Sequence, residues 1–298
     1  MKHLLSLEQL TQAEIEGLIH SAVDLKAKRK SCPQVLAGQT WALIFNKSST
    51  RTRVSFEVGI RELGGSPMFL SGSEMQLGRG EPVKDTARVL GRMVDGAIIR
   101  TFAQKDVDDF ASFSGIPTIN ALTDDEHPCQ ILADLQTMQE RLGGWKNKRV
   151  CFLGDGDCNV ARSWIWASAR LGFELVVGAP APFQPADSFM ERVPKGTVSV
   201  ESDAMRAVSG CDVVYTDVWV SMGKEAESAD RLRVLSPYQI NTQLMAAANP
   251  GAVVMHCLPA YRGKEITDEV MEAHAGIIFE EAENRLHAQK AVMTELVR

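Results

Sequence analysis

The chain has 298 residues, of which 45% are hydrophobic and 23% charged, and its net charge at pH 7 is −6. These values are typical of a globular protein long enough for two α/β domains, and the negative charge disfavours nucleic acid as a partner. Apolar stretches of signal-peptide or membrane-span length are missing, so neither a leader nor a membrane location is expected. The six cysteines form no Cys-x-x-Cys pair, which favours reduced thiols in a cytoplasm.

Helical and strand patterns alternate through the first half of the chain. The predicted helices are 7–28 (capped by Ser6), 55–63, 83–93 and 129–142, and the predicted strands are 41–45, 67–70, 96–100 and 118–121. Short apolar strands separated by helices predict βαβ units and a parallel sheet buried on both faces. Gly143-Gly144 then ends the last helix and marks a joint between domains.

The second half repeats this alternation. Its predicted strands are 149–153, 173–177, 197–200, 212–215, 252–255 and 276–279, followed by a last helix at about 286–296. The predicted fold class is therefore α/β, with two doubly wound parallel-sheet domains joined by helices. We expect the domains at residues 1–142 and 143–285, with the helix in 286–298 packing back on the first domain.

The segment after the first predicted strand combines hydroxyl and cationic side chains. Ser49, Thr50, Arg51 and Thr52 precede an amphipathic helix, so they are expected at its N-terminus. Backbone N–H groups there bind anions, while hydroxyls and a planar arginine fork donate to phosphate oxygens. Capping alone is the alternative, but three hydroxyls and two arginines within 49–53 exceed that need. A Walker loop is missing, so the pattern predicts an anion site of another kind.

A second motif, His127-Pro128-Cys129-Gln130, follows the strand predicted at 118–121. Loops at the carboxyl ends of parallel strands are where α/β proteins bind ligands. His127 can donate there to a carbonyl oxygen, and Gln130 can accept from an amide NH₂. The alternative for His127 taken alone is an ordinary helix-start residue.

Two more candidate residues follow strands of the second half. Cys257, in His256-Cys257-Leu258-Pro259, is expected to face a cleft where cations lower its thiol pKa, and an inert buried cysteine is the alternative. Asp217 precedes a Ser-Met-Gly segment and could meet an amine, although a helix cap is an equally simple interpretation.

Gly154-Asp155-Gly156 invites comparison with a dinucleotide-binding loop. The pattern is weak, because Asn159 stands where the third glycine belongs and the next predicted strand lacks a ribose-binding acid. Asn159 is instead a candidate for contact with a substrate.

Taken together, these segments resemble the aspartate/ornithine carbamoyltransferase family, over nearly the whole chain. The carbamoyl phosphate motifs of that family are matched by residues 49–53, His127-Pro128-x-Gln130 and Arg100. The ornithine branch is matched by Asp217-x-x-x-Ser221-Met222-Gly223, by the segment 256–259 and by 283–289. One departure is that Asp157-Cys158 precedes Asn159, where the family often has paired asparagines.

The resemblance implies that residues 1–142 bind carbamoyl phosphate and residues 143–285 bind ornithine. It also implies a homotrimer, or a multiple of trimers, with active sites at subunit interfaces and Gln76 supplied by a neighbouring subunit. The implied carbamoyl phosphate contacts are Ser49, Thr50, Arg51, Thr52, Gln76, Arg100, His127, Gln130, Cys257, Leu258 and Arg285. The implied ornithine contacts are Asn159, Asp217, Ser221 and Met222, and the implied catalytic residues are Arg100, His127, Asp217 and Cys257.

The chemistry expected from these residues is attack of the ornithine δ-amine on the carbamoyl carbon, with fixed donors stabilising the oxyanion. We expect neither a cofactor nor a metal. Putrescine or aspartate as acceptor, a nicotinamide dehydrogenase and a non-catalytic phosphate-binding regulator remain as alternatives. The missing third glycine argues against the dehydrogenase, and Cys257 with Ser221-Met222-Gly223 argues against the regulator.

Overall fold

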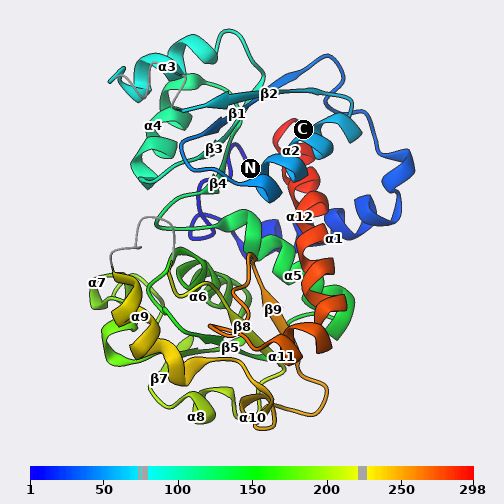
Figure 1. Cartoon of the computed structure of the whole chain (residues 1–298). Coiled ribbons are helices and arrows are strands. Elements are labelled where there is room, and N and C mark those ends of the chain that lie inside the picture. Colours follow the sequence, from blue (N-terminus) through cyan, green and yellow to red (C-terminus); the bar gives the residue numbers. More distant parts are fainter. Residues whose placement is uncertain (73–74, 76–79, 221–226) are drawn as a thin grey trace. The chain divides into compact units, whose positions relative to one another are not determined.

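The computed structural model describes residues 1–72, 75, 80–220 and 227–298 (Figure 1). The chain forms two compact units: unit 1 comprises residues 1–136 and 283–298, and unit 2 comprises residues 137–282. Each unit contains one parallel sheet, which confirms the predicted fold class. The units divide within α5 (Pro128–Leu142) and α12 (Ala275–Leu296), whereas the sequence placed the first joint at Gly143-Gly144. These glycines, with φ of 74° and 119°, end α5 instead.

The sheet of unit 1 has the strand order β2-β1-β3-β4, and all neighbouring strands are parallel. Its strands are β1 (Thr40–Phe45), β2 (Ser66–Ser71), β3 (Gly96–Arg100) and β4 (Thr118–Leu122). The other helices of the unit are α1 (Gln12–Ala27), α2 (Thr50–Glu62), α3 (Val83–Leu90) and α4 (Gln104–Ser114). Residues of β1 and β3 pack against Ala87 of α3 and Phe110 of α4 in one buried cluster, so α3 and α4 contact the same apolar side chains of the sheet.

Three helices of unit 1 differ most from the prediction. The first begins after Thr11 rather than Ser6, because Thr11 and Glu14 form a reciprocal capping box. Helix α2 begins at Thr50, since the Ser49 side chain accepts from the N–H of Thr52. Helix α4 was not predicted, although its buried positions 107, 110, 111 and 114 have helical spacing.

The sheet of unit 2 has the parallel order β7-β6-β5-β8-β9. Its strands are β5 (Arg149–Leu153), β6 (Glu174–Gly178), β7 (Val198–Glu201), β8 (Val213–Thr216) and β9 (Val253–His256), each within one residue of the prediction. Residues 276–279 were wrongly predicted as a further strand, and they lie in α12. Ile278 is buried and Phe279 is 54% exposed, a pattern that a short apolar run shows on a helix as well as on a strand.

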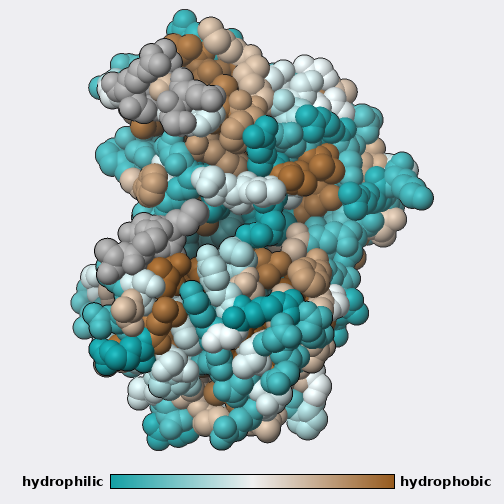
Figure 2. Space-filling model, viewed as in Figure 1, coloured by the Kyte–Doolittle hydropathy of each residue, from teal (hydrophilic) through white to brown (hydrophobic). Residues whose placement is uncertain are grey.

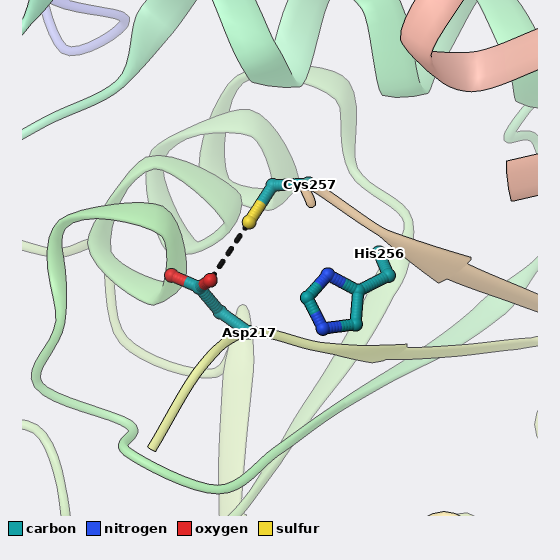
Figure 3. Close-up of side chains that lie close together, drawn as sticks. All are labelled: Asp217, His256 and Cys257. Atoms are coloured by element: carbon teal, nitrogen blue, oxygen red, sulfur yellow. Dashed lines mark hydrogen bonds between the residues drawn. The ribbon is translucent and has the colours of Figure 1, made fainter. Parts of the chain in front are cut away.

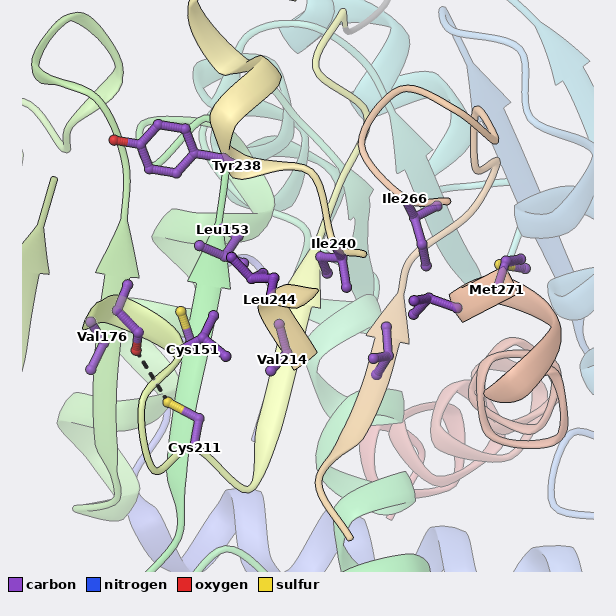
Figure 4. Packing of buried hydrophobic residues seen from close by; sticks show 14 of the residues in the cluster. Cys151, Leu153, Val176, Cys211, Val214, Tyr238, Ile240, Leu244, Ile266 and Met271 are labelled. Atoms are coloured by element: carbon purple, nitrogen blue, oxygen red, sulfur yellow. Dashed lines mark hydrogen bonds between the residues drawn. The ribbon is translucent and has the colours of Figure 1, made fainter. Parts of the chain in front are cut away.

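Both faces of this second sheet are covered. On one face, Cys151, Val214 and Val254 pack with residues of α8 (Ala204–Val208), α10 (Thr242–Met245) and α11 (Asp268–Ala273), as Figure 4 shows in part. On the other face, the Trp164 ring of α6 (Asn159–Leu171) lies 5.3 Å from the ring of Tyr215. The remaining helices are α7 (Asp187–Met190) and α9 (Ser228–Leu235). Among the described residues, no helix is long and apolar enough to span a membrane.

Each sheet has one point where the strand order reverses direction, and in open α/β sheets ligands bind outside the carboxyl ends of the strands at such points. In unit 1 this point lies between β1 and β3, so the segments that follow Phe45 and Arg100 meet there. In unit 2 it lies between β5 and β8, where residues 154–159 and Asp217 follow their strands. The topology therefore selects the same segments as the sequence motifs.

Candidate active site

The N-terminus of α2 presents the hydroxyl and arginine side chains predicted to bind an anion. The Ser49 hydroxyl accepts from the N–H of Thr52 at 3.3 Å and lies 3.0 Å from the Thr52 hydroxyl. Thr52 is buried, while Thr50 and Arg51 are exposed. Arg53 differs from Arg51, because its Nε donates to Glu57 at 2.7 Å and its guanidinium lies 3.7 Å from the centre of the Phe69 ring. Arg51 is thus the arginine of this turn that is available to an anion.

Arg285 of α12 joins this turn to the start of α5. Its Nη2 donates to the Thr52 hydroxyl at 3.3 Å, and its Nη1 donates to Oε1 of Gln130 at 2.7 Å. The Gln130 amide nitrogen in turn donates to Oδ1 of Asp134 at 2.8 Å. All four side chains are buried, so the low local dielectric strengthens these hydrogen bonds.

Arg100 and His127 are also buried in unit 1, with 6% and 5% of their surfaces exposed. Arg100 ends β3, and its carbonyl accepts from the N–H of Asn46 at 2.8 Å, which ties the ends of β1 and β3 together. Burial is the main reason that the pKa of His127 lies well below its ordinary value, and the charges of Arg285 and Arg100 lower it further. His127 is therefore neutral at neutral pH, and one ring nitrogen can donate a hydrogen bond without carrying a charge.

In unit 2, Asp217 and Cys257 form a hydrogen-bonded pair at the ends of the neighbouring strands β8 and β9 (Figure 3). The Cys257 thiol donates to Oδ1 of Asp217 at 2.8 Å, and the N–H of Val218 donates to the same oxygen at 2.6 Å. Burial raises the pKa of Asp217, although His256 and the two hydrogen bonds oppose this shift. A partly buried carboxylate with an acceptor atom at the strand end is suited to holding an alkylammonium group.

His256 fixes the backbone that carries Cys257. Its Nδ1 accepts from the N–H of Leu258 at 2.9 Å, so the ring proton is on Nε2, which lies 3.3 Å from Oε1 of Glu265. Leu258 has φ of 57° and precedes a cis peptide bond to Pro259. Among the described residues, Asp217, His256 and Cys257 form a group with one ligand atom each within 4.8 Å of one another. The hydrogen bonds above involve both ring nitrogens of His256.

The loop after β5 is shaped by packing rather than by a dinucleotide. A Cβ on Gly156 would lie 2.5 Å from Cγ1 of Val177, so glycine is required there without any ligand. Cys158 caps α6, and its thiol pKa is raised well above the ordinary value by burial, with the charges of Asp155 and Asp217 adding to the effect. Asn159 is the first residue of α6 and is partly buried. These contacts weaken the dehydrogenase alternative.

Arg231 of α9 is a buried residue of this region that sequence reasoning missed. Its Nε donates to the carbonyl of Trp219 at 2.6 Å, Nη1 donates to Glu227 at 3.4 Å, and Nη2 pairs with Asp155. It thereby holds residues on both sides of 221–226. The one local sequence feature that could have pointed to Arg231 was its spacing of four residues from Glu227. Its contact with Asp155 joins residues 76 positions apart, which no local pattern predicts. Gln76, Ser221 and Met222 lie outside the described residues.

Comparison with known proteins bears directly on these two units. The model of the carbamoyl-P binding domain of aspartate/ornithine carbamoyltransferase matches residues 2–140, and the model of its Asp/Orn binding domain matches residues 146–296. The chain belongs to the aspartate/ornithine carbamoyltransferase family. This confirms the resemblance of the sequence motifs.

Named relatives and solved structures agree with this membership. An ornithine carbamoyltransferase of Akkermansia muciniphila is 58% identical over 99% of this chain and 98% of its own length. One from Methanoculleus marisnigri is 46% identical over 99% and 97%. The Pyrococcus furiosus ornithine carbamoyltransferase structure has a TM-score of 0.93 at 43% identity, covering 98% of this chain and 96% of that one. The anabolic Campylobacter jejuni enzyme gives 0.93 at 42% identity, with 99% of each chain covered.

Proposed function

We propose that the chain transfers the carbamoyl group of carbamoyl phosphate to the δ-amine of L-ornithine, giving citrulline and phosphate. The observation that carries the proposal is the hydrogen-bonded pair of Asp217 and Cys257 at the ends of β8 and β9. It supports the proposal because this carboxylate, which we assign to amine binding, belongs to the unit that matches the Asp/Orn binding domain. The name shared by the relatives supports ornithine as the amine.

Carbamoyl phosphate binds the residues that surround the N-terminus of α2. The phosphate oxygens accept from backbone N–H groups, hydroxyls, guanidinium groups and one side-chain amide. The donors are Ser49, Thr50, Arg51, Thr52 and Arg100, with the amide of Gln76 from a neighbouring subunit. Gln130, Arg285 and the segment of Cys257 and Leu258 orient the carbamoyl amide. This set places the negative charge of phosphate among permanent cations while leaving the carbonyl carbon open to attack.

Arg100, Thr52 and His127 polarise the carbonyl oxygen. Negative charge grows on that oxygen as the tetrahedral intermediate forms, so preorganised donors stabilise the transition state more than the bound substrate. The lowered pKa of His127 keeps its ring neutral near neutral pH. The neutral ring still carries one N–H, so its capacity to donate does not change as the pH varies in that range.

Ornithine binds through Asn159, Ser221 and Met222 at its amino-acid end and through Asp217 and Cys257 at its δ-amine. A C–N bond forms, the C–O bond to phosphate breaks, and the departing phosphate takes the proton that the amine loses. The amine's electron pair forms the new bond and the C–O pair leaves with phosphate, so no atom changes oxidation state and no redox cofactor is needed.

The proposal is tested by incubating the protein with carbamoyl phosphate and ornithine and measuring citrulline and phosphate together. We expect the two products in equal amounts, and neither when ornithine is left out. Phosphate release without any ureido product would instead identify a phosphatase or a phosphate-binding protein.

We also propose that the working enzyme is a trimer, or a multiple of trimers, in the cytoplasm. The motifs that match the family support this assembly. Unit 1 exposes apolar side chains that a partner subunit could cover, including Val54 at 54% and Met68 at 45% exposure. Figure 2 shows apolar patches on an otherwise hydrophilic face of each unit.

Subunit mixing tests whether Gln76 acts in a neighbouring subunit. Gln76→Ala and Arg51→Ala chains are each expected to be inactive alone. After denaturation and joint refolding, mixed trimers should regain part of the citrulline-forming activity, because some sites then receive both native residues. Verified mixed trimers without activity would place both residues in the same subunit's site.

A further inference from the structure

Asp134 is a fully buried carboxylate on α5 that the proposed reaction does not use. Its exposed fraction is 0%, and it stands four residues after Gln130, so the two side chains share one face of the helix. The Gln130 amide nitrogen donates to its Oδ1 at 2.8 Å. A buried carboxylate is unfavourable unless it is hydrogen-bonded, so its presence beside a proposed substrate contact needs a reason.

The chain of hydrogen bonds through Gln130 has only one consistent polarity. An ionised carboxylate can only accept, and the Gln130 NH₂ group is the one turned toward Asp134. Arg285 can only donate, and its Nη1 lies 2.7 Å from Oε1 of Gln130. With Asp134 on one side and Arg285 on the other, flipping the Gln130 amide would set a donor against a donor and an acceptor against an acceptor.

We infer that Asp134 is a positioning residue for the carbamoyl group: it locks the Gln130 amide so that Oε1 faces outward to donors. The donors are Arg285, which also donates to the Thr52 hydroxyl at 3.3 Å, and the NH₂ group of bound carbamoyl phosphate. Phosphate itself has no such NH₂ group, so the lock favours the substrate over its product. The inference rests on the proposed function and deepens it.

A swap of the two side-chain types tests the inference. Asp134→Asn removes the acceptor-only group, and Gln130→Glu places two carboxylates against each other. The double variant D134N/Q130E restores one donor and one acceptor at the contact, leaves an acceptor facing Arg285 and keeps the native net charge. We expect each single change to raise the KM for carbamoyl phosphate about tenfold or more, and the double variant to return within about threefold of native.

A matched control is available on α1, where Gln12 donates to Glu16 with the same four-residue spacing and the same 2.8 Å distance, but in the solvent. Glu16→Gln should leave the KM for carbamoyl phosphate unchanged. The KM for ornithine should stay within about twofold of native in every folded variant, which a general loss of structure would not allow.

Three results would overturn the inference: a KM within twofold of native in folded Asp134→Asn, a folded double variant that stays as impaired as Gln130→Glu, or a double variant that does not fold. If Asp134→Asn alone fails to fold, the comparison of Gln130→Glu with the double variant decides. Calorimetric binding of carbamoyl phosphate to the same proteins separates this inference from the proposed function, because binding is measurable even if no citrulline forms.

Discussion

Arg51→Ala is expected to remove tight carbamoyl phosphate binding while the protein stays folded. A charge-assisted hydrogen bond contributes about 1.5–3 kcal/mol, so the loss of a bidentate contact should weaken binding by about a hundredfold or more. Arg51 is exposed in the first turn of α2, so its removal should leave the core packing intact. Lysine should restore only part of the affinity, because a point charge cannot reproduce the planar fork.

Arg53→Ala is the matched control for this substitution. Arg53 stands in the same turn, but Glu57 and the Phe69 ring hold its guanidinium. Calorimetry with carbamoyl phosphate should show near-native affinity for Arg53→Ala and strongly weakened binding for Arg51→Ala. The two variants should unfold at similar temperatures. Native affinity in a folded Arg51→Ala protein would remove this residue from the phosphate site.

The second large effect expected is a rise of kcat/KM for ornithine with pH. Only the uncharged amine can attack, yet an alkyl amine has a pKa of about 10.4, so roughly one molecule in a thousand is uncharged near pH 7.4. At low ornithine, kcat/KM should therefore climb about tenfold per pH unit until a group on the enzyme intervenes. On the acid side, the raised pKa of Asp217 means that its charge is lost at a higher pH than for an ordinary aspartate. Ornithine binding should weaken as the pH falls through that value.

Cys257→Ser tests whether the thiol is the intervening group. An unperturbed thiol titrates near 8.5 or so, whereas a serine hydroxyl does not titrate in this range but can still donate to Asp217. We expect unchanged carbamoyl phosphate affinity, a higher KM for ornithine and a shifted or absent inflection in the pH profile. If the KM for ornithine and the profile both match the native protein, the proton that the δ-ammonium must lose before attack leaves by Asp217, phosphate or solvent.

Most strands could be predicted from the sequence because short apolar runs ended by glycine or polar residues leave few alternatives. The run at 276–279 was the exception, since three apolar residues fit a strand and a buried helix equally well. The start of α1 was misplaced because two segments fit the capping-box pattern: Ser6 with Gln9 three residues later, and Thr11 with Glu14. The structure forms the box at Thr11.

The residues of the candidate site also fall into a group that the sequence could predict and a group that it could not. Residues at strand ends, such as Arg100 and Asp217, were predictable because parallel topology brings strand ends to one edge. The supporting contacts were not predictable. Arg231 meets Asp155 across 76 residues, and the tautomer of His256 is fixed by the N–H of Leu258, which donates to Nδ1, and by Glu265, which accepts from Nε2. Such partners are chosen by tertiary packing, which leaves no periodic trace in the sequence.

The central claim is that ornithine is the amine that receives the carbamoyl group, and a competition in one vessel tests it most directly. The protein is given ¹³C-labelled carbamoyl phosphate with equal concentrations of ornithine, putrescine and aspartate. The ureido products are then distinguished and quantified by their ¹³C NMR signals. The partition of label then equals the ratio of kcat/KM values for the three amines. We predict that nearly all of the label enters citrulline. A majority in carbamoylputrescine or carbamoylaspartate would contradict the assignment.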